Sequence, residues 1–233
     1  MGLSLKVFRP RFCNVELVWR LQLNLAKRLF NLKRTLLILF LAANAVWIQA
    51  CGKQDLTQPS CNFVQNSEGQ RVSWGASAKV SFYVDQSVPT EYYASIQAAA
   101  DSWNQKLGHE QIVIAGWTQK PGSPVQDGLN VIYFMKTWNA NLSNEQARTT
   151  IYWTGNRITE ADVLIDAVNF TFSTNQAEAG KVDLQSLVLH EFGHALGLKH
   201  VTEVSSVMVP TLAYDYLRRA PQEFDMTSLK CEY

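Results

Sequence analysis

Short runs of hydrophobic residues, separated by more polar stretches, predict five strands after residue 75. Each run is rich in β-branched and aromatic residues and has the length of an ordinary strand. The runs are 80–84, 112–114, 131–134, 149–153 and a last one that begins at 163–165. The longer stretches between them leave room for helices and loops, and no internal repeat is apparent.

Three helices are predicted between and after these strands. In the first, apolar residues recur at helical spacing behind Thr90, the expected N-cap, and Gly108 ends the helix. These apolar residues are Tyr93, Ile96, Ala100, Trp103 and Leu107. The second helix follows Asp183 as N-cap. Its buried side is expected to hold Leu184, Leu187, Val188, Phe192, Ala195 and Leu196. The third begins with Pro221 in its first turn and ends near Leu229.

Composition divides the chain into three parts. Residues 1–50 hold eight of the 21 Lys and Arg and one of the 20 acids, which leaves 13 basic and 19 acidic residues, net −6, in 51–233. An acidic body without a basic run argues against nucleic acid as a partner. Residues 51–75 are polar and rich in Gln, Ser, Asn and Gly, as expected of a tether. We therefore expect a leader, a tether at 51–75 and one α+β domain over 76–233.

The leader has the features of an export signal. A cationic segment ending at Lys33-Arg34 precedes a short apolar stretch and then small residues, which is typical of a secretory signal. The unbroken apolar run is shorter than the roughly 18 residues of a membrane-spanning helix. The segment ahead of this run is long for such a signal, and a non-Met start nearer Leu32 would explain that length. An uncleaved anchor remains an alternative.

Residues 48–51 resemble a bacterial lipoprotein box, in which Cys51 would be lipidated and become the new N-terminus. Gln49 departs from the small or apolar residue that is usual there. Ordinary cleavage after Ala45 or Ala50 is the competing interpretation and would give a periplasmic or secreted protein. Gly52 is not an acidic retention signal for the inner membrane, so lipidation predicts an outer-membrane anchor in a host with two membranes.

Two further cysteines, Cys61 and Cys231, form an even pair if Cys51 carries lipid. In an oxidising compartment they could form one disulfide between the start and the end of the domain. Two unpaired thiols are the alternative. A third interpretation makes Cys61 an inhibitory thiolate over a metal, although no surrounding motif supports it.

One eleven-residue motif carries most of the candidate chemistry, with the pattern H-E-x-x-H-x-x-G-x-x-H. His190 and His194 are four residues apart, so they lie on one helix face and can hold one metal ion. Glu191 is placed to accept a proton from a metal-bound water and not to act as a ligand. Gly197 can adopt a positive φ and bring in His200 as third ligand. Three protein ligands leave a tetrahedral position open for water, which is typical of a catalytic zinc site.

This motif and the residues after it resemble the metzincin metalloproteases, and among them the matrixins. Metzincins place a methionine in a tight turn beneath the metal, and Met208 lies eight residues after His200. Matrixins also have a Pro two residues after the Met, matched here by Pro210. The resemblance implies a five-stranded mixed sheet with a long helix, an active-site helix and a C-terminal helix. It also implies one catalytic zinc, with Met208 as part of the site but not as a ligand.

Several positions depart from the family. Val201 replaces a usual Ser, and Leu212 replaces a common Tyr. His109 is the only other histidine, so the second, structural zinc of vertebrate matrixins is not expected. The inhibitory propeptide motif is missing. Asp162 and Asp166 could bind calcium, but two acids in a strand are more often solvated, and no second metal is assigned.

The resemblance implies a monomeric zinc endopeptidase that acts on protein or peptide substrates. Glu191 would accept the proton of the attacking water and deliver it to the leaving amine. The strand at 149–153 would guide an extended substrate, unless it is an ordinary strand of the sheet. One alternative is a non-catalytic zinc-containing surface lipoprotein that binds protein or glycan, although an intact Glu191 argues against it. Hydrolysis of a non-peptide amide is a third option that no residue favours.

Overall fold

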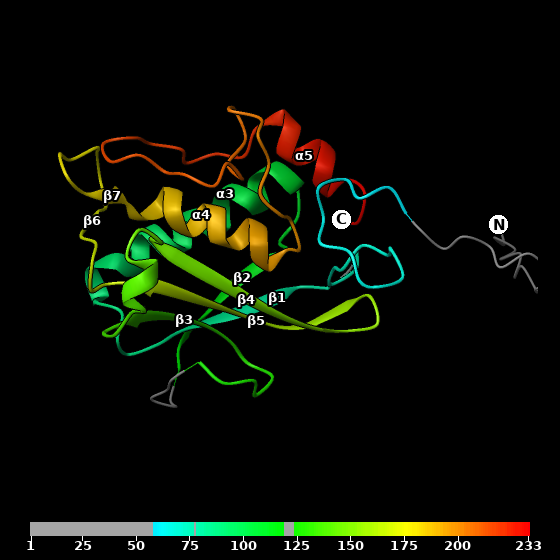
Figure 1. Cartoon of the computed structure of the whole chain (residues 1–233), viewed down its shortest axis with the longest axis horizontal. Coiled ribbons are helices and arrows are strands. Elements are labelled where there is room, and N and C mark those ends of the chain that lie inside the picture. The colour runs from blue at the N-terminus through cyan, green and yellow to red at the C-terminus, as the bar shows by residue number, and fades with distance from the viewer. Residues whose placement is uncertain (1–57, 77, 119–123) are drawn as a thin grey trace, which may run out of the picture. The chain divides into compact units, whose positions relative to one another are not determined.

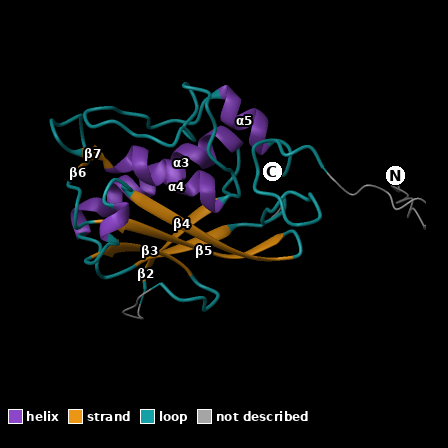
Figure 2. Cartoon of the chain, in the orientation of Figure 1, coloured by secondary structure: helices purple, strands orange, loops and turns teal. Residues whose placement is uncertain are grey.

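The five-stranded mixed sheet lies against one layer of helices (Figures 1 and 2). The computed structural model describes residues 58–76, 78–118 and 124–233. The strands are β1 (Val80–Val84), β2 (Ile112–Trp117), β3 (Asn130–Met135), β4 (Ala147–Thr154) and β5 (Arg157–Asp166). Their order in the sheet is β2-β1-β3-β5-β4. The α+β fold class and the five-stranded mixed sheet are thus confirmed.

Strand β4 forms one edge of the sheet and is the only antiparallel strand in it. β1 pairs in parallel with β2 and β3, and β3 pairs in parallel with β5. β4 runs antiparallel to β5, with Thr149 opposite Val163 and Thr150 opposite Asp162. Because successive side chains of a strand point to opposite faces, Thr149 and Thr150 face different sides of the sheet.

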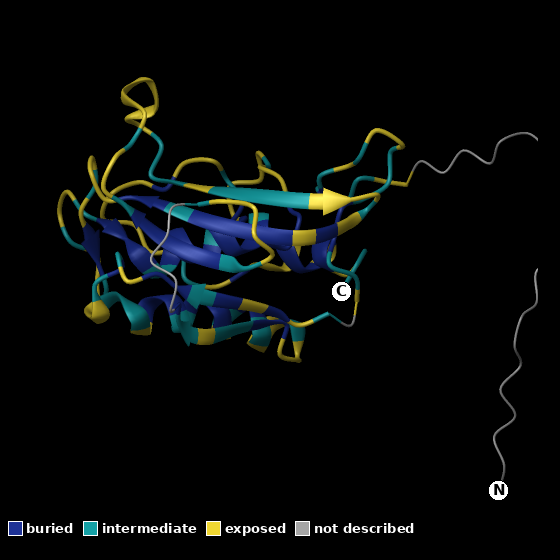
Figure 3. Cartoon of the chain, turned by 90° about the horizontal axis from the view of Figure 1, so that it is seen from below, coloured by how far each residue is buried: buried dark blue, intermediate teal, exposed yellow. Residues whose placement is uncertain are grey.

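The helix layer is formed by α3 (Tyr93–Leu107) and α4 (Leu184–Ala195), with α5 (Glu223–Leu229) after them. Trp103 of α3 is fully buried, and its Nε1 donates to the Leu189 carbonyl of α4 at 2.9 Å. Phe82 of β1 and Phe192 of α4 place their ring centroids 5.0 Å apart. Figure 3 shows the resulting buried interior and the exposed loops around it. The helix that carries the motif is therefore fixed from two sides.

The helix termini agree with the sequence pattern in part. Asp183 caps α4 by accepting the amide of Ser186 at 2.9 Å, and the predicted buried side of this helix is confirmed. Gly108 ends α3 with a φ of 77°. Thr90, the expected N-cap, instead starts a 3-10 turn at Thr90–Tyr92 that leads into α3. Pro221 lies ahead of α5, because the capping box is made by Gln222 and Asp225.

Two strand predictions also differ from the structure. β5 begins at Arg157, well before residue 163, because its first half pairs with β4 in a hairpin whose turn contains Gly155. A short parallel pair, β6 (Phe172–Ser173) and β7 (Val182–Asp183), was not predicted. Two residues are too few to produce a recognisable alternation.

Residues 58–75, predicted to be a polar tether, pack onto the domain. Phe63 and Val72 are fully buried, and Phe63 forms an antiparallel bridge with Leu198. Cys61 forms a disulfide with Cys231, so its sulfur is not available as a thiolate over a metal. The packed unit thus starts ahead of residue 76, because two apolar side chains and the disulfide hold this segment.

The disulfide is typical of a protein exported to an oxidising compartment. The predicted leader (1–50) and the candidate lipidation site Cys51 lie outside the described residues. Within the described ranges, no helix has the length and apolarity needed to cross a membrane.

Candidate metal centre

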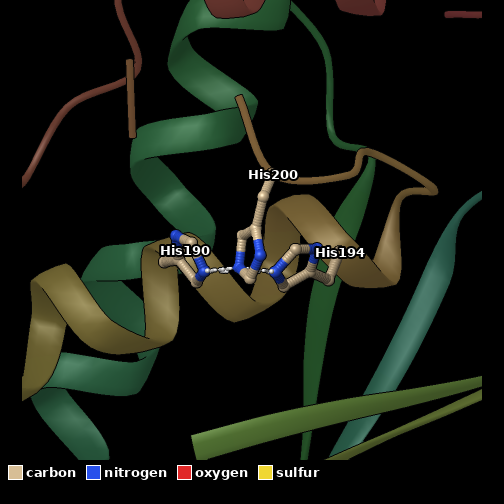
Figure 4. Close-up of side chains that lie close together, drawn as sticks. All are labelled: His190, His194 and His200. Carbon is tan, nitrogen blue, oxygen red and sulfur yellow. Dashed lines mark hydrogen bonds between the residues drawn. The ribbon is translucent and has the colours of Figure 1, made fainter. Parts of the chain in front are cut away.

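Three imidazole rings converge at the C-terminal half of α4 (Figure 4). His190 and His194 come from consecutive turns of the helix, and His200 comes from the segment after it. Their Nε2 atoms lie 3.1 Å apart for His190 and His194, 3.2 Å for His190 and His200, and 3.0 Å for His194 and His200. In the described part of the chain, this is the one group of three or more His, Cys, Asp or Glu residues that could hold a metal ion.

Main-chain carbonyls fix the tautomer of two of these rings. His190 Nδ1 lies 2.7 Å from the Val207 oxygen, and His194 Nδ1 lies 2.7 Å from the Leu198 oxygen. A carbonyl oxygen only accepts, so each Nδ1 must carry the proton, and each Nε2 presents a lone pair to the centre of the cluster. A carbonyl behind the ligand is the usual partner of a metal-bound histidine.

The triangle of nitrogens fits a tetrahedral zinc ion. Zinc–nitrogen bonds of about 2.0–2.1 Å at tetrahedral angles separate two ligand nitrogens by roughly 3.3 Å, close to the 3.0–3.2 Å observed. Three lone pairs that face one another without a cation between them would repel. The three imidazole nitrogens and their spacing therefore fit a zinc ion, the metal that the motif implies.

Burial of most of His190 and His194, and partial removal of His200 from water, favour the neutral state that a ligand needs. Burial, followed by the neighbouring His194, lowers the pKa of His190 to about 3. Burial also lowers the pKa of His194, and burial together with the nearby His194 lowers that of His200. All three rings are therefore available to a cation near neutral pH without first losing a proton.

Glu191 lies beside the cluster with only 3% of its surface exposed. Burial raises the pKa of its carboxyl to about 7, although a hydrogen bond from Thr149 of β4 lowers it in part. The Thr149 hydroxyl donates to Oε2 at 2.6 Å and lies 3.1 Å from the Glu191 main-chain oxygen. A carboxyl group with a pKa near operating pH is suited to accept and release a proton.

The chain turns sharply after α4 at Gly197, and this turn places His200. Gly197 has a φ of +103°, and a Cβ there would lie 2.3 Å from the Val72 oxygen. The amide of Leu198 donates to the carbonyl of Gly193 at 3.0 Å. Positive φ and a close backbone neighbour both require glycine, so the predicted role of Gly197 in the turn has a clear physical cause.

Met208 lies beneath the metal-binding helix and is 2% exposed. A Cβ added at Gly193 would lie 2.2 Å from the Met208 sulfur, so the two residues are in close contact. The turn that holds Met208 is tied to α5, because the Ser206 hydroxyl donates to Asp225 and the Met208 amide donates to Ser206 Oγ at 2.9 Å. These hydrogen bonds hold Met208 in place beneath the metal-binding helix.

A cavity of about 370 Å³ runs between β4 and α4 and contains all three histidines and Glu191 in its lining. Thr149 and Ile151 of β4 line one wall, and Leu187 and Arg218 also border the cavity. The strand predicted to guide substrate is therefore the one that borders this cavity. An extended segment could lie along it within reach of the metal-binding atoms.

Residues 132–230 match the sequence profile of the family described as Matrixin. They are the matrixin-family part of the packed domain. A search of curated proteins gives no match to the chain. The three-histidine cluster lies inside the matched region and is typical of the catalytic zinc site of matrixins. The matrixin domain of this chain is thus a zinc metalloendopeptidase domain.

Some predicted residues have a different environment from the one expected. Asp162 and Asp166, expected to be solvated, are buried at 1% and 0% exposure. Asp162 accepts the Val131 amide at 3.0 Å, and Asp166 accepts the Val168 amide at 2.9 Å. Main-chain donors therefore take the place of water around both carboxylates.

Some roles of residues in the matrixin domain were not predicted from the sequence. These are Thr149 as the partner of Glu191, Asp225 as the anchor of the methionine turn, and the carbonyls of Val207 and Leu198. A single Thr or Asp has no distinctive local pattern, and a carbonyl has no sequence signal. Only Asp225 had a usable clue, because an acid three residues after Gln222 completes a capping box.

Proposed function

We propose that this chain is an exported endopeptidase in which His190, His194 and His200 hold one zinc ion and Glu191 transfers the proton. The observation that carries the proposal is the tautomer arrangement: two carbonyls direct the Nε2 lone pairs of His190 and His194 toward a point shared with His200. When bound, zinc would lower the pKa of a water to about 7 and polarise the peptide carbonyl.

The residues of the chain supply the rest of the chemistry. The Glu191 carboxylate accepts a proton from the water that attacks the peptide carbonyl carbon. It then delivers this proton to the nitrogen of the leaving amine, so the peptide C–N bond breaks and a new carboxyl group and a new amine are released. Burial of Glu191 supports this role, because it brings the pKa of the carboxyl to about 7.

The edge strand β4 would hold the substrate. Among the described strands, β4 pairs with β5 alone, so an extended peptide could pair with the main-chain groups on its other side. Ile151 and Thr149 border the cavity that contains Glu191, which would bring the scissile bond past the carboxylate. Protein or peptide chains that can adopt an extended form are therefore the proposed substrates, and the protein would act as a monomer.

Metal removal tests the endopeptidase function directly. Purified protein should cleave a diverse peptide library, lose this activity with a chelator and regain it when one equivalent of zinc is returned. Cleavage that survives complete removal of zinc would contradict the proposal. Zinc-loaded protein that cleaves no peptide would instead favour a module that binds protein or glycan.

We further propose that Cys51 carries a lipid anchor in the cell envelope. The support is the sequence of residues 48–51 and the disulfide between Cys61 and Cys231, which is typical of an oxidising compartment. Mass spectrometry of the mature N-terminus tests this idea. A lipidated Cys51 is expected, whereas an unmodified N-terminus after Ala45 or Ala50 would contradict it.

A further inference from the structure

Glu191 has a single hydrogen-bond partner for its side chain among the described residues. That partner is the hydroxyl of Thr149, 2.6 Å from Oε2. No hydrogen bond from the described part of the chain reaches Oε1, which is the atom left for water or substrate. The orientation of a nearly buried carboxylate therefore depends on one side chain from a different element, the edge strand β4.

The Thr149 hydroxyl also lies close to a second acceptor. The main-chain carbonyl oxygen of Glu191 is 3.1 Å from Oγ1, and a hydroxyl has one proton to donate. While Glu191 is a carboxylate, the proton points to Oε2, where a charged acceptor makes the stronger bond. Once Oε1 holds the transferred proton, Oε2 is the carbonyl oxygen of the acid and still accepts from the hydroxyl, which can also turn to the Glu191 main-chain carbonyl. Both states of Glu191 keep a partner.

We infer that Thr149 is the positioning residue of Glu191: its hydroxyl holds Oε2 so that Oε1 faces the attacking water. The inference rests on the proposed role of Glu191 and adds a residue to it. Thr149 also borders the substrate cavity, so β4 would align the substrate and orient the base from the same point. A side chain without a hydroxyl would leave Oε2 without a partner and the carboxylate free to rotate.

Thr150 provides a matched control on the same strand. It is the next residue of β4, of the same type, and its side chain points to the other face of the sheet. Thr149→Val and Thr150→Val each replace a hydroxyl by a methyl group of similar size in a strand. Any effect of strand packing or β-propensity should appear in both variants, but loss of the bond to Glu191 occurs in the first alone.

Steady-state cleavage of a fluorogenic peptide tests the inference. T149V should lower kcat about tenfold or more, with KM and the zinc dissociation constant within about twofold of the parent protein. T149S should restore kcat, and kcat of T149V should lie at least about tenfold below that of T150V, which reports any effect of changing the strand itself. A T149V enzyme with normal kcat would overturn the inference. So would a loss of kcat equal in T149S and T149V, or a change confined to KM.

Two further measurements separate this inference from the proposed function. If E191Q cleaves peptides as the parent does, the proton-transfer role of Glu191 is wrong and the inference fails with it. If E191Q is inactive but T149V is normal, only the inference fails. In zinc-free protein, the carboxylate infrared band that E191Q removes should shift in T149V and stay in place in T150V, and an unshifted band in T149V would contradict the hydrogen bond.

Discussion

The main-chain amide of Lys199 donates a hydrogen bond to the carbonyl of Asn62 at 2.8 Å. Lys199 directly precedes the third histidine of the cluster, and Asn62 directly follows a disulfide-bonded cysteine. A second bond joins the Val64 amide to the Gly197 carbonyl at 2.8 Å. The segment at 58–75 therefore forms one wall of the turn that presents His200, and the disulfide holds this segment in place.

Removing the disulfide should weaken both the fold and the metal site. The C61S/C231S variant removes a cross-link between cysteines 170 residues apart, and loss of such a cross-link typically costs about 2–5 kcal/mol. The turn that carries His200 should then be less ordered, so the zinc dissociation constant should rise. Urea unfolding and chelator competition measure the two effects. Unchanged zinc affinity together with lower stability would show that the disulfide supports the fold alone.

The contact between Gly193 and Met208 predicts a compensating pair of substitutions. A Cβ at residue 193 would be 2.2 Å from the Met208 sulfur, so G193A should destabilise the protein by about 1–3 kcal/mol. M208A removes that sulfur, and the double variant should be more stable than the sum of the single effects predicts. Thermal and urea unfolding of the four proteins measure the coupling.

Gly197 is the control for this pair. Its added Cβ would meet the main-chain oxygen of Val72, which no side-chain substitution can remove. G197A should therefore be destabilising whether or not Met208 is changed. Additive effects of G193A and M208A on stability would contradict the close packing of Met208 against Gly193.

Asp162 predicts a pH-dependent loss of stability that does not involve the metal-binding residues. Burial, aided by the nearby Glu160 and Asp127, raises the pKa of its carboxyl from 3.8 to about 7, against the lowering effect of the Val131 hydrogen bond. Below about pH 4, both the folded and the unfolded state are protonated. As the pH rises from about 4 to about 7, the unfolded state loses its proton first, so this residue makes the folded state progressively less stable.

The D162N variant should remove this dependence, because an amide keeps the acceptor for Val131 and does not ionise. Urea midpoints measured at several pH values should show D162N gaining on the parent protein between about pH 4 and 7 and holding a constant advantage above this range. D101N, at an exposed position of α3, serves as control. Parallel pH profiles for D162N and the parent would contradict a buried, protonated Asp162.

The sequence predicted those parts of the molecule that local chemistry determines. Asp183 caps its helix, Gly108 ends α3, and the spacing of the histidines alone indicated a shared metal, as the convergent rings now bear out. Each of these features depends on residues that are near one another in the chain. The same holds for the short hydrophobic runs that predicted the strands, although the early start of β5 depends on its hairpin partner β4.

The features that sequence did not predict depend on contacts between distant segments. Thr149 meets Glu191 across 42 residues. Cys61 and Cys231, 170 residues apart, form the disulfide that the sequence suggested, but the sequence alone did not decide between this disulfide and two free thiols. The segment at 58–75 is polar on average, and two buried side chains, Phe63 and Val72, are enough to attach it. Pairings of this kind are set by the packed fold and not by local propensity, so a single sequence carries little signal for them.

The most direct test of the central claim compares the parent protein with E191Q, each loaded with zinc and checked for one ion per chain. The substitution keeps the size of the side chain but removes its ability to accept a proton. The account predicts that E191Q binds zinc with unchanged stoichiometry and cleaves a peptide library at least about a hundredfold more slowly. Peptide cleavage by E191Q at the parental rate would contradict it.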